Sequence, residues 1–192
     1  MKIDIDMQDI RNHSLITMDR LIVLKNILES VRCLPGNAAE LGVYRGGTSK
    51  LIALVLYPKI FYAFDSFCGL TNAFSGVDKH ENGDFSDVIF MNVKNYLNYL
   101  NVRICRGYFP ETTKNITDSE FCFAHFDGDT YCSCISFLDF FYPRMVKNGV
   151  MVFDDYDWHK CPGVKRAINE FLKNKKEIVY EIASFQAMIV KI

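Results

Sequence analysis

Apolar residues recur at intervals of three and four along residues 14–31, a spacing that places them on one face of a helix. Pro35-Gly36 follows this segment and predicts its end. Elsewhere the apolar residues come in short runs typical of buried strands, and these runs alternate with further segments of helical spacing. The pattern predicts strands at residues 38–43, 60–64, 102–105, 121–126, 150–153, 177–182 and 186–191, and helices at 47–56, 88–100, 131–145 and 162–172.

The alternation of strands and helices predicts an α/β fold with a doubly wound, mostly parallel, seven-stranded sheet and helices on both faces. The predicted strands are almost continuously apolar, as strands covered on both faces should be. Ligands of such sheets bind beyond the carboxyl ends of the strands. We therefore expect the residues that end five of the strands to meet along one edge of the sheet: Glu40, Asp65, Gly107, Asp127 and Asp154.

Residues 67–87 form a long, polar, glycine-containing stretch that shows neither helical spacing nor a strand-like apolar run. Loops of about 20 residues in a compact domain are usually functional, so we predict an active-site lid, with a passive surface loop as the alternative. The length of 192 residues suits one hydrophobic core. We expect residues 1–192 to form a single domain, in which residues 1–34 are an N-terminal helical segment.

The composition is that of an ordinary globular protein and argues against several functional classes. Hydrophobic residues make up 49% of the chain, and the formal net charge of -1 lacks the basic excess of a nucleic-acid-binding protein. No apolar run approaches the roughly 20 residues that span a bilayer, and residues 1–9 are too polar and acidic for a signal peptide. The seven cysteines show no spacing typical of a disulfide framework or a structural zinc site, so we expect a cytoplasmic protein.

A glycine-containing turn, Glu40-Leu41-Gly42-Val43-Tyr44-Arg45-Gly46-Gly47, follows the first predicted strand and opens a helix. Glycines there let a ligand approach the backbone closely. The turn matches neither G-x-G-x-x-G nor a P-loop, and Glu40 would repel a pyrophosphate but suits a cationic ligand. The Asp65 carboxylate can accept hydrogen bonds from both hydroxyls of a ribose. A tight turn with surface acids is the alternative interpretation.

Eight motifs occur in an order and spacing that resemble the macrocin O-methyltransferase (TylF/MycF-type) family. They lie at residues 35–47, 64–70, 83–86, 107–112, 124–131, 141–144, 149–156 and 161–163, so the resemblance covers roughly residues 35 to 173. The resemblance implies a class I methyltransferase (Rossmann-like) fold, S-adenosylmethionine as methyl donor, a divalent metal that is usually Mg²⁺, and a sugar hydroxyl as acceptor.

The resemblance also implies roles for individual residues. The methionine end of the cofactor would be held by Glu40, Gly42, Tyr44, Gly46, Gly47 and Thr48, and the ribose by Asp65. Ser66 and the turn of Gly107, Tyr108 and Phe109 would flank the adenine. His125 is a candidate for a cofactor contact or for a buried structural role. An anionic cleft of this kind suits the sulfonium and ammonium groups of the cofactor.

Asp127, Asp154 and Asp155 provide three carboxylates on adjacent strand ends, and we predict that they hold the metal, because hard cations prefer oxygen ligands. A solvated surface cluster is the alternative. Asp127 and Asp129 are candidate general bases, with His125 and His159 behind them. Asp129 can also orient a metal ligand or cap the helix that follows, and His159 can be an exposed loop residue.

The acceptor stays open, because Thr71 stands where family members usually have proline and the N-terminal segment looks short for the family. A small molecule or a glycan is the expected substrate, and a homo-oligomer is possible. The alternatives are an O-methyltransferase of a catechol-like or other small vicinal diol and a cofactor-binding module without catalysis. An NAD-dependent dehydrogenase is the weakest interpretation, given the glycine spacing and Glu40.

Overall fold

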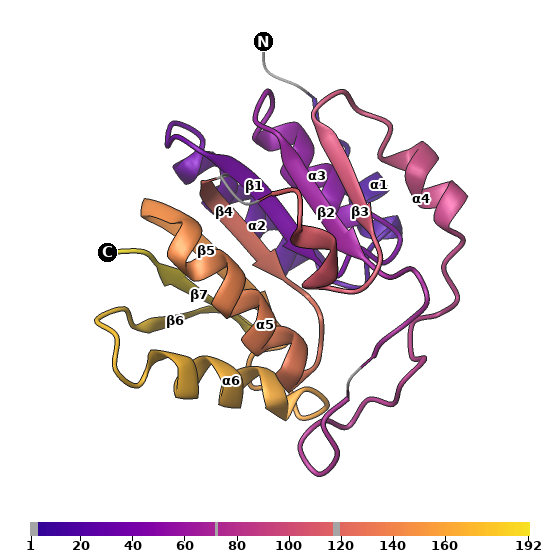
Figure 1. Cartoon of the computed structure of the whole chain (residues 1–192). Coiled ribbons are helices and arrows are strands. Elements are labelled where there is room, and N and C mark those ends of the chain that lie inside the picture. Colours follow the sequence, from indigo (N-terminus) through magenta and orange to yellow (C-terminus); the bar gives the residue numbers. More distant parts are fainter. Residues whose placement is uncertain (1–3, 72, 117–119) are drawn as a thin grey trace.

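The computed structural model describes residues 4–71, 73–116 and 120–192 (Figure 1). Its central sheet has the strand order β3-β2-β1-β4-β5-β7-β6. The strands are β1 Asn37–Leu41, β2 Phe61–Asp65, β3 Val102–Arg106, β4 Phe121–Phe126, β5 Met145–Asp154, β6 Val179–Ala183 and β7 Gln186–Val190. Only β7 runs antiparallel to its neighbours among the pairings that the described residues form. The predicted mostly parallel, seven-stranded sheet is confirmed.

Helices cover both faces of this sheet (Figure 1). The helices are α1 Met7–Asn12, α2 Met18–Val31, α3 Gly47–Val55, α4 Phe90–Tyr96, α5 Tyr131–Phe141 and α6 Pro162–Leu172, with short 3-10 turns at Glu111–Thr113 and Tyr142–Arg144. Leu24 of α2 and Ile52 of α3 belong to the apolar core of one face, and Phe137 of α5 and Ile168 of α6 belong to the core of the other. The β4 strand is buried along its whole length, which explains why all of its residues except His125 are apolar.

The helices differ from the predicted ones mainly at their ends. The N-terminal segment contains two helices, because Asp6 caps a separate α1 by accepting hydrogen bonds from the backbone N–H groups of Gln8 (2.9 Å) and Asp9 (3.1 Å). The α5 helix ends at Phe141, just before Pro143, and β5 begins at Met145. The α4 helix is shorter than residues 88–100. Residues 1–3 of the N-terminal segment and residue 72 of the expected lid lie outside the described residues.

Helices long and apolar enough to cross a lipid bilayer are absent from the described part of the chain.

Candidate active site

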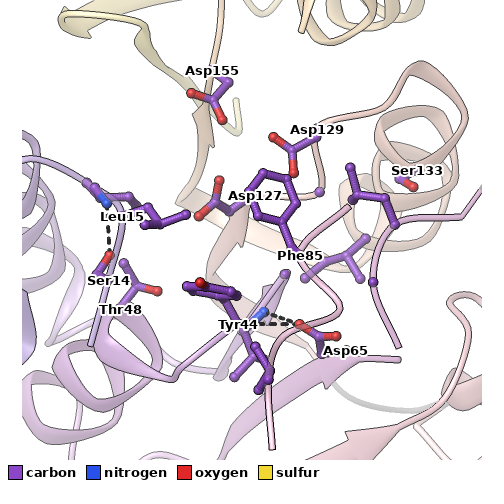
Figure 2. A pocket seen from close by; sticks show the side chains of 18 of the residues that line it. Ser14, Leu15, Tyr44, Thr48, Asp65, Phe85, Asp127, Asp129, Ser133 and Asp155 are labelled. Carbon is purple, nitrogen blue, oxygen red and sulfur yellow. Dashed lines mark hydrogen bonds between the residues drawn. The ribbon is translucent and has the colours of Figure 1, made fainter. Parts of the chain in front are cut away.

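A cavity of about 520 Å³ lies at the carboxyl ends of β1 to β5 (Figure 2). The strand ends contribute Gly42, Asp65, Gly107, Asp127 and Asp155 to its wall. The segment that leads into α2, the loop 67–87 and the turn between β6 and β7 complete the wall. The volume falls within the range of small-molecule sites. The sheet edge predicted from the sequence is therefore a cavity of a size suited to a ligand.

The turn after β1 brings the backbone against the end of β4. Gly42 has a φ of 95°, and a Cβ atom there would lie 2.0 Å from the carbonyl oxygen of Asp127. Tyr44 and Thr48 line the cavity beside Gly42. Gly42 thus sets the spacing between the predicted cofactor turn and the acidic strand end of β4.

Gly46 and Gly47 support this turn from behind and lie outside the cavity wall. Gly46 precedes α3 as its N-cap residue. Gly47 donates its backbone N–H to the carbonyl of His13 at 3.0 Å, and a Cβ atom on Gly47 would lie 2.4 Å from the carbonyl oxygen of Ile10. Gly46 packs instead against Tyr96 and Leu97 at the end of α4, so the positions of Gly46 and Gly47 do not support their predicted direct contact with a cofactor.

Replacing Gly42 with Ala is expected to lower stability and to weaken binding of S-adenosylhomocysteine. Gly76→Ala is the matched control, because Gly76 has a φ of 83° but no atom within 4 Å of the position of a Cβ. Both variants bear the left-handed strain of about 1–2 kcal/mol. Gly42→Ala should cost about 1–3 kcal/mol more, because it overpacks against Asp127. Equal unfolding free energies for the two variants in urea would contradict this interpretation of the turn.

Asp65 fixes the same turn from the end of β2. Its Oδ2 accepts hydrogen bonds from the backbone N–H groups of Val43 (2.8 Å) and Tyr44 (3.0 Å), and its Oδ1 accepts one from Phe67 (2.7 Å) (Figure 2). The carboxylate also lines the cavity, and its oxygens have capacity for further bonds. Its position is compatible with a ribose contact. The residues predicted to flank the adenine line the cavity as well: Ser66, Gly107, Tyr108 and Phe109.

Glu40 and His125 lie behind the cavity rather than on its wall. They are paired residues on β1 and β4, and both are fully buried. His125 Nδ1 lies 2.8 Å from a Glu40 carboxylate oxygen, and the other Glu40 oxygen accepts a hydrogen bond from the Ser49 hydroxyl of α3. The position of these two residues therefore does not support their predicted direct contact with a cofactor.

Asp154 continues this buried network instead of facing the other acids. Its Oδ2 lies 2.7 Å from His125 Nε2, and its Oδ1 accepts hydrogen bonds from Arg20 of α2 (2.9 Å) and Gln186 of β7 (3.1 Å). Burial alone would lower the pKa of His125, but the hydrogen bonds with Asp154 and Glu40 raise this pKa to about 10. Two acids and two cations thus compensate one another beneath the cavity, as buried charges must.

The acidic cluster that faces the cavity consists of Asp127, Asp129 and Asp155 (Figure 2). One carboxylate oxygen from each lies within 4.8 Å of the others. Asp129 replaces Asp154 in the predicted set, because Asp154 gives both oxygens to protein donors. Asp154 is the last residue of β5, whereas Asp155 follows the strand with a φ of 58° and lines the cavity; Arg20 contacts both carboxylates.

Burial and the repulsion between like charges raise the pKa values of the three acids in this cluster. Burial raises the pKa of Asp127 well above its usual range, and the charges of Asp154 and Asp155 raise it further. Burial and Asp155 do the same for the pKa of Asp129, and burial and Asp154 raise the pKa of Asp155. A cation between these groups would relieve the repulsion.

Of two other residues predicted to be catalytic, Asp129 lines the cavity and His159 does not. Asp129 does not cap α5, because Thr130 is the N-cap residue and its hydroxyl accepts the Ser133 backbone N–H. Asp129 lines the cavity, as a base must. His159 is an exposed loop residue outside the cavity wall, while its neighbour Trp158 is part of the wall. The position of His159 does not support its predicted catalytic role.

The loop 67–87 makes polar contacts around the cavity from its middle and from its C-terminal end. Asp78 accepts hydrogen bonds from the backbone N–H of Tyr131, at the start of α5, and from that of Phe74 within the loop. Asp87 accepts hydrogen bonds from Tyr44 (3.2 Å) and Arg45 (2.9 Å) of the turn after β1. Phe85 lines the cavity. This placement is compatible with the predicted lid.

The segment before and at the start of α2 contributes residues to the cavity that were not predicted from the sequence. Ser14, Leu15 and Arg20 line the cavity, and Arg20 contacts Asp154 and Asp155 (3.4 Å) across the sheet edge. Arg20 is one of several charged residues in α2, which also contains Asp19, Lys25 and Glu29, so the sequence pattern did not single it out. The Phe185 side chain in the turn between β6 and β7 also lines the cavity, and the sequence pattern did not single it out either.

Comparison with known proteins agrees with this architecture. The family model for macrocin-O-methyltransferase (TylF) matches residues 5–190. The chain is 28% identical over 178 residues to the demethyldecarbamoylnovobiocin O-methyltransferase of Streptomyces niveus, covering 83% of this chain and 67% of the relative. It is 27% identical over 170 residues to the 8-demethyl-8-(2,3-dimethoxy-alpha-L-rhamnosyl)-tetracenomycin-C 4'-O-methyltransferase of Streptomyces olivaceus, covering 78% of this chain and 64% of the relative.

The structure of the O-methyltransferase NovP superposes with a TM-score of 0.82 at 25% identity, and the match covers 93% of this chain and 82% of that one. The fold and the site therefore define an S-adenosylmethionine-dependent O-methyltransferase with a class I, Rossmann-like fold. The chain belongs to the TylF macrocin-O-methyltransferase family. It spans about two thirds of the length of the two relatives named above.

Proposed function

We propose that this enzyme methylates a sugar hydroxyl and that a divalent cation, Mg²⁺ in the simplest case, is held by Asp127 and Asp155. The observation that carries the proposal is the placement of these acids in the same cavity as the turn after β1. A cofactor on that turn and a hydroxyl at the acids would share one enclosed space. The arrangement suits transfer of a methyl group from one to the other.

The donor set fits a hard cation. Asp127 and Asp155 offer carboxylate oxygens, the ligands that Mg²⁺ takes in small number while it keeps several waters. Burial and mutual repulsion raise the pKa values of these acids, so a cation would favour their charged forms. When bound, such a cation would supply Lewis acidity and a template for two neighbouring hydroxyls.

The protein side chains would bind the cofactor and accept the proton of the acceptor. The turn after β1 and Asp65 would hold the cofactor, so that its methyl group faces the acids. Asp129 would accept the proton of the acceptor hydroxyl, since burial raises its pKa from the usual acidic range toward that of a useful base. The hydroxyl oxygen forms a bond to the methyl carbon as the bond from carbon to sulfur breaks, which leaves S-adenosylhomocysteine. Alignment of these atoms can supply about 7–11 kcal/mol of the barrier reduction.

A sugar acceptor is favoured by the relatives and by the cavity. The Streptomyces olivaceus relative is named for a 4'-O-methyl transfer on a rhamnosyl compound. Trp158 and Phe185 provide aromatic surface in the cavity wall, against which the C–H face of a sugar ring can pack. The acids provide the polar groups that neighbouring hydroxyls need.

The test is turnover of S-adenosylmethionine with Mg²⁺ against a panel of rhamnosides, other glycosides, nucleotide sugars and a catechol. The proposal predicts formation of S-adenosylhomocysteine together with a methyl ether on one sugar hydroxyl, identified by NMR. Turnover with the catechol alone would instead indicate a small aromatic diol as the acceptor and would contradict the sugar assignment.

A further inference from the structure

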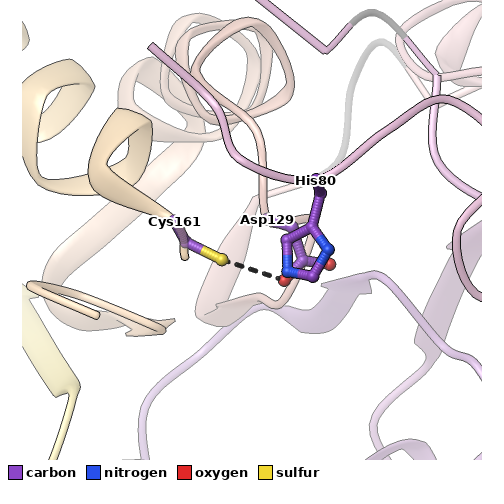
Figure 3. A group of neighbouring side chains, drawn as sticks. All are labelled: His80, Asp129 and Cys161. Atoms are coloured by element: carbon purple, nitrogen blue, oxygen red, sulfur yellow. Dashed lines mark hydrogen bonds between the residues drawn. The ribbon is translucent and has the colours of Figure 1, made fainter. Parts of the chain in front are cut away.

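A second group of side chains that could bind a metal shares Asp129 with the acidic cluster, and its three members are drawn in Figure 3. It consists of His80 from the loop 67–87, Asp129 after β4 and Cys161 just before α6. One ring nitrogen, one carboxylate oxygen and the thiol sulfur all lie within 4.8 Å of one another. The Cys161 sulfur lies 3.3 Å from Asp129 Oδ1, a separation suited to two ligands of one tetrahedral ion.

His80 is oriented as a metal ligand should be. Its Nδ1 lies 2.8 Å from Asp84 Oδ2, so the carboxylate fixes the tautomer in which Nδ1 carries the proton. The side chain is only 10% exposed, between the rings of Phe85 and Trp158. Its Nε2 is buried and has no hydrogen-bond partner among the residues that the structure describes. A buried nitrogen lone pair without a partner points to a missing ligand.

We propose that His80, Asp129 and Cys161 form a site for a transition-metal ion such as Zn²⁺. A thiolate and an imidazole select borderline-soft ions over Mg²⁺, which prefers oxygen. The thiolate and the carboxylate together match the charge of a divalent ion, which a buried site requires. Asp129 also lines the cavity, so a fourth coordination position would face the substrate side.

Such an ion would link the position of the loop 67–87 to Asp129, the proposed base. It would tie His80 to two elements that lie far from it in the sequence, and it would hold the loop closed. It would also occupy Asp129, so Zn²⁺ should inhibit turnover; this consequence rests on the proposed role of Asp129 as base. Binding of the ion itself does not depend on the proposed reaction, and it is measured without substrate.

The experiment is a titration of the protein with Co²⁺, which reports a thiolate ligand through a sulfur-to-cobalt charge-transfer band. Wild-type protein should bind one Co²⁺ with this band, and excess Zn²⁺ but not Mg²⁺ should displace it. Cys161→Ser should lose the band, and His80→Gln and Asp84→Asn should weaken Co²⁺ binding by about 10–100-fold. Cys33→Ser is the matched control, because Cys33 is an exposed free cysteine that is not part of this group.

Melting temperature and affinity for S-adenosylhomocysteine should stay at wild-type values in Asp84→Asn, which shows that the fold is intact. The site is overturned if the band persists in Cys161→Ser, or if His80→Gln and Asp84→Asn bind Co²⁺ as tightly as Cys33→Ser. Failure of methyl transfer with every acceptor would contradict the proposed function and leave this result unaffected.

Discussion

Replacing Asp127 with Asn should lower kcat by on the order of 10²–10⁴-fold, the equivalent of losing several kcal/mol of Lewis-acid stabilisation, while the affinity for S-adenosylhomocysteine changes little. Asp127 offers an oxygen to the acidic cluster, but the cofactor would rest mainly on the turn after β1 and on Asp65. The variant removes a charge at the place where the acceptor oxygen is activated. Steady-state kinetics with the best acceptor and calorimetry with S-adenosylhomocysteine measure the two effects separately.

Asp157→Asn is the control for this variant. Asp157 is an exposed acid close to the cluster in sequence, and it pairs with Lys165 on the surface at 2.8 Å. Its replacement should leave kcat within about twofold of wild type, since surface ion pairs contribute little. Equal losses of turnover and cofactor affinity in Asp127→Asn would indicate a structural role for Asp127 instead.

Replacing His125 with Ala should lower the free energy of unfolding by about 3–5 kcal/mol. His125 is the group that lies between Glu40 and Asp154, and its loss leaves both buried acids without their shared partner. For a chain of this length the change corresponds to a fall in melting temperature of roughly 6–20 °C. His159→Ala, at an exposed histidine, should leave the melting temperature unchanged.

The stabilisation by His125 should also depend on pH. The pKa of His125 is about 10 in the folded protein against 6.5 for an unperturbed histidine, so the folded state binds its proton more tightly. The contribution is complete below about pH 6.5 and is lost as the pH rises toward 10. The stability difference between wild type and His125→Gln, measured in urea, should therefore shrink over this interval. A constant difference from pH 6 to pH 10 would show that His125 does not carry this charge.

Most of the sheet could be predicted from the sequence, because its central strands are buried on both faces and are therefore mostly apolar. The β4 strand is the clearest case, since all six of its residues are buried. Short elements with little buried surface were harder to predict. The α1 helix has only Ile10 as a buried residue, so no apolar periodicity marks it in the sequence. The only local signal for its start was Asp6, which can cap a helix.

The candidate site was predictable at the level of strand ends but not of side-chain direction. Of the residues predicted to end the strands at this edge, Asp65, Gly107 and Asp127 line the cavity, whereas Glu40 and Asp154 lie behind it and Asp155 takes the place of Asp154. Strand alternation could not separate Asp154 from Asp155, because Asp155 lies beyond the end of β5 and has a φ of 58°. The direction of Asp154 became definite only with its partners Arg20 and Gln186, which come from distant parts of the chain.

The group of His80, Asp129 and Cys161 could not be predicted from the sequence either. His80, Asp129 and Cys161 belong to a loop, a strand end and a helix start, and their spacing in the sequence matches no metal-binding motif. Only the packing of the loop 67–87 against the starts of α5 and α6 brings them together. The hydrogen bond from the Tyr131 backbone to Asp78 is one of the contacts that hold the loop there.

The central claim is that an acceptor oxygen is activated at the acidic cluster with the help of a divalent cation. It is tested most directly by the rate of methyl transfer from S-adenosylmethionine before and after removal of metal with EDTA, followed by titration with Mg²⁺. We expect the rate to fall to background after EDTA treatment and to return on addition of Mg²⁺, with Asp127→Asn unresponsive to the metal. An undiminished rate in the metal-free enzyme would contradict the claim.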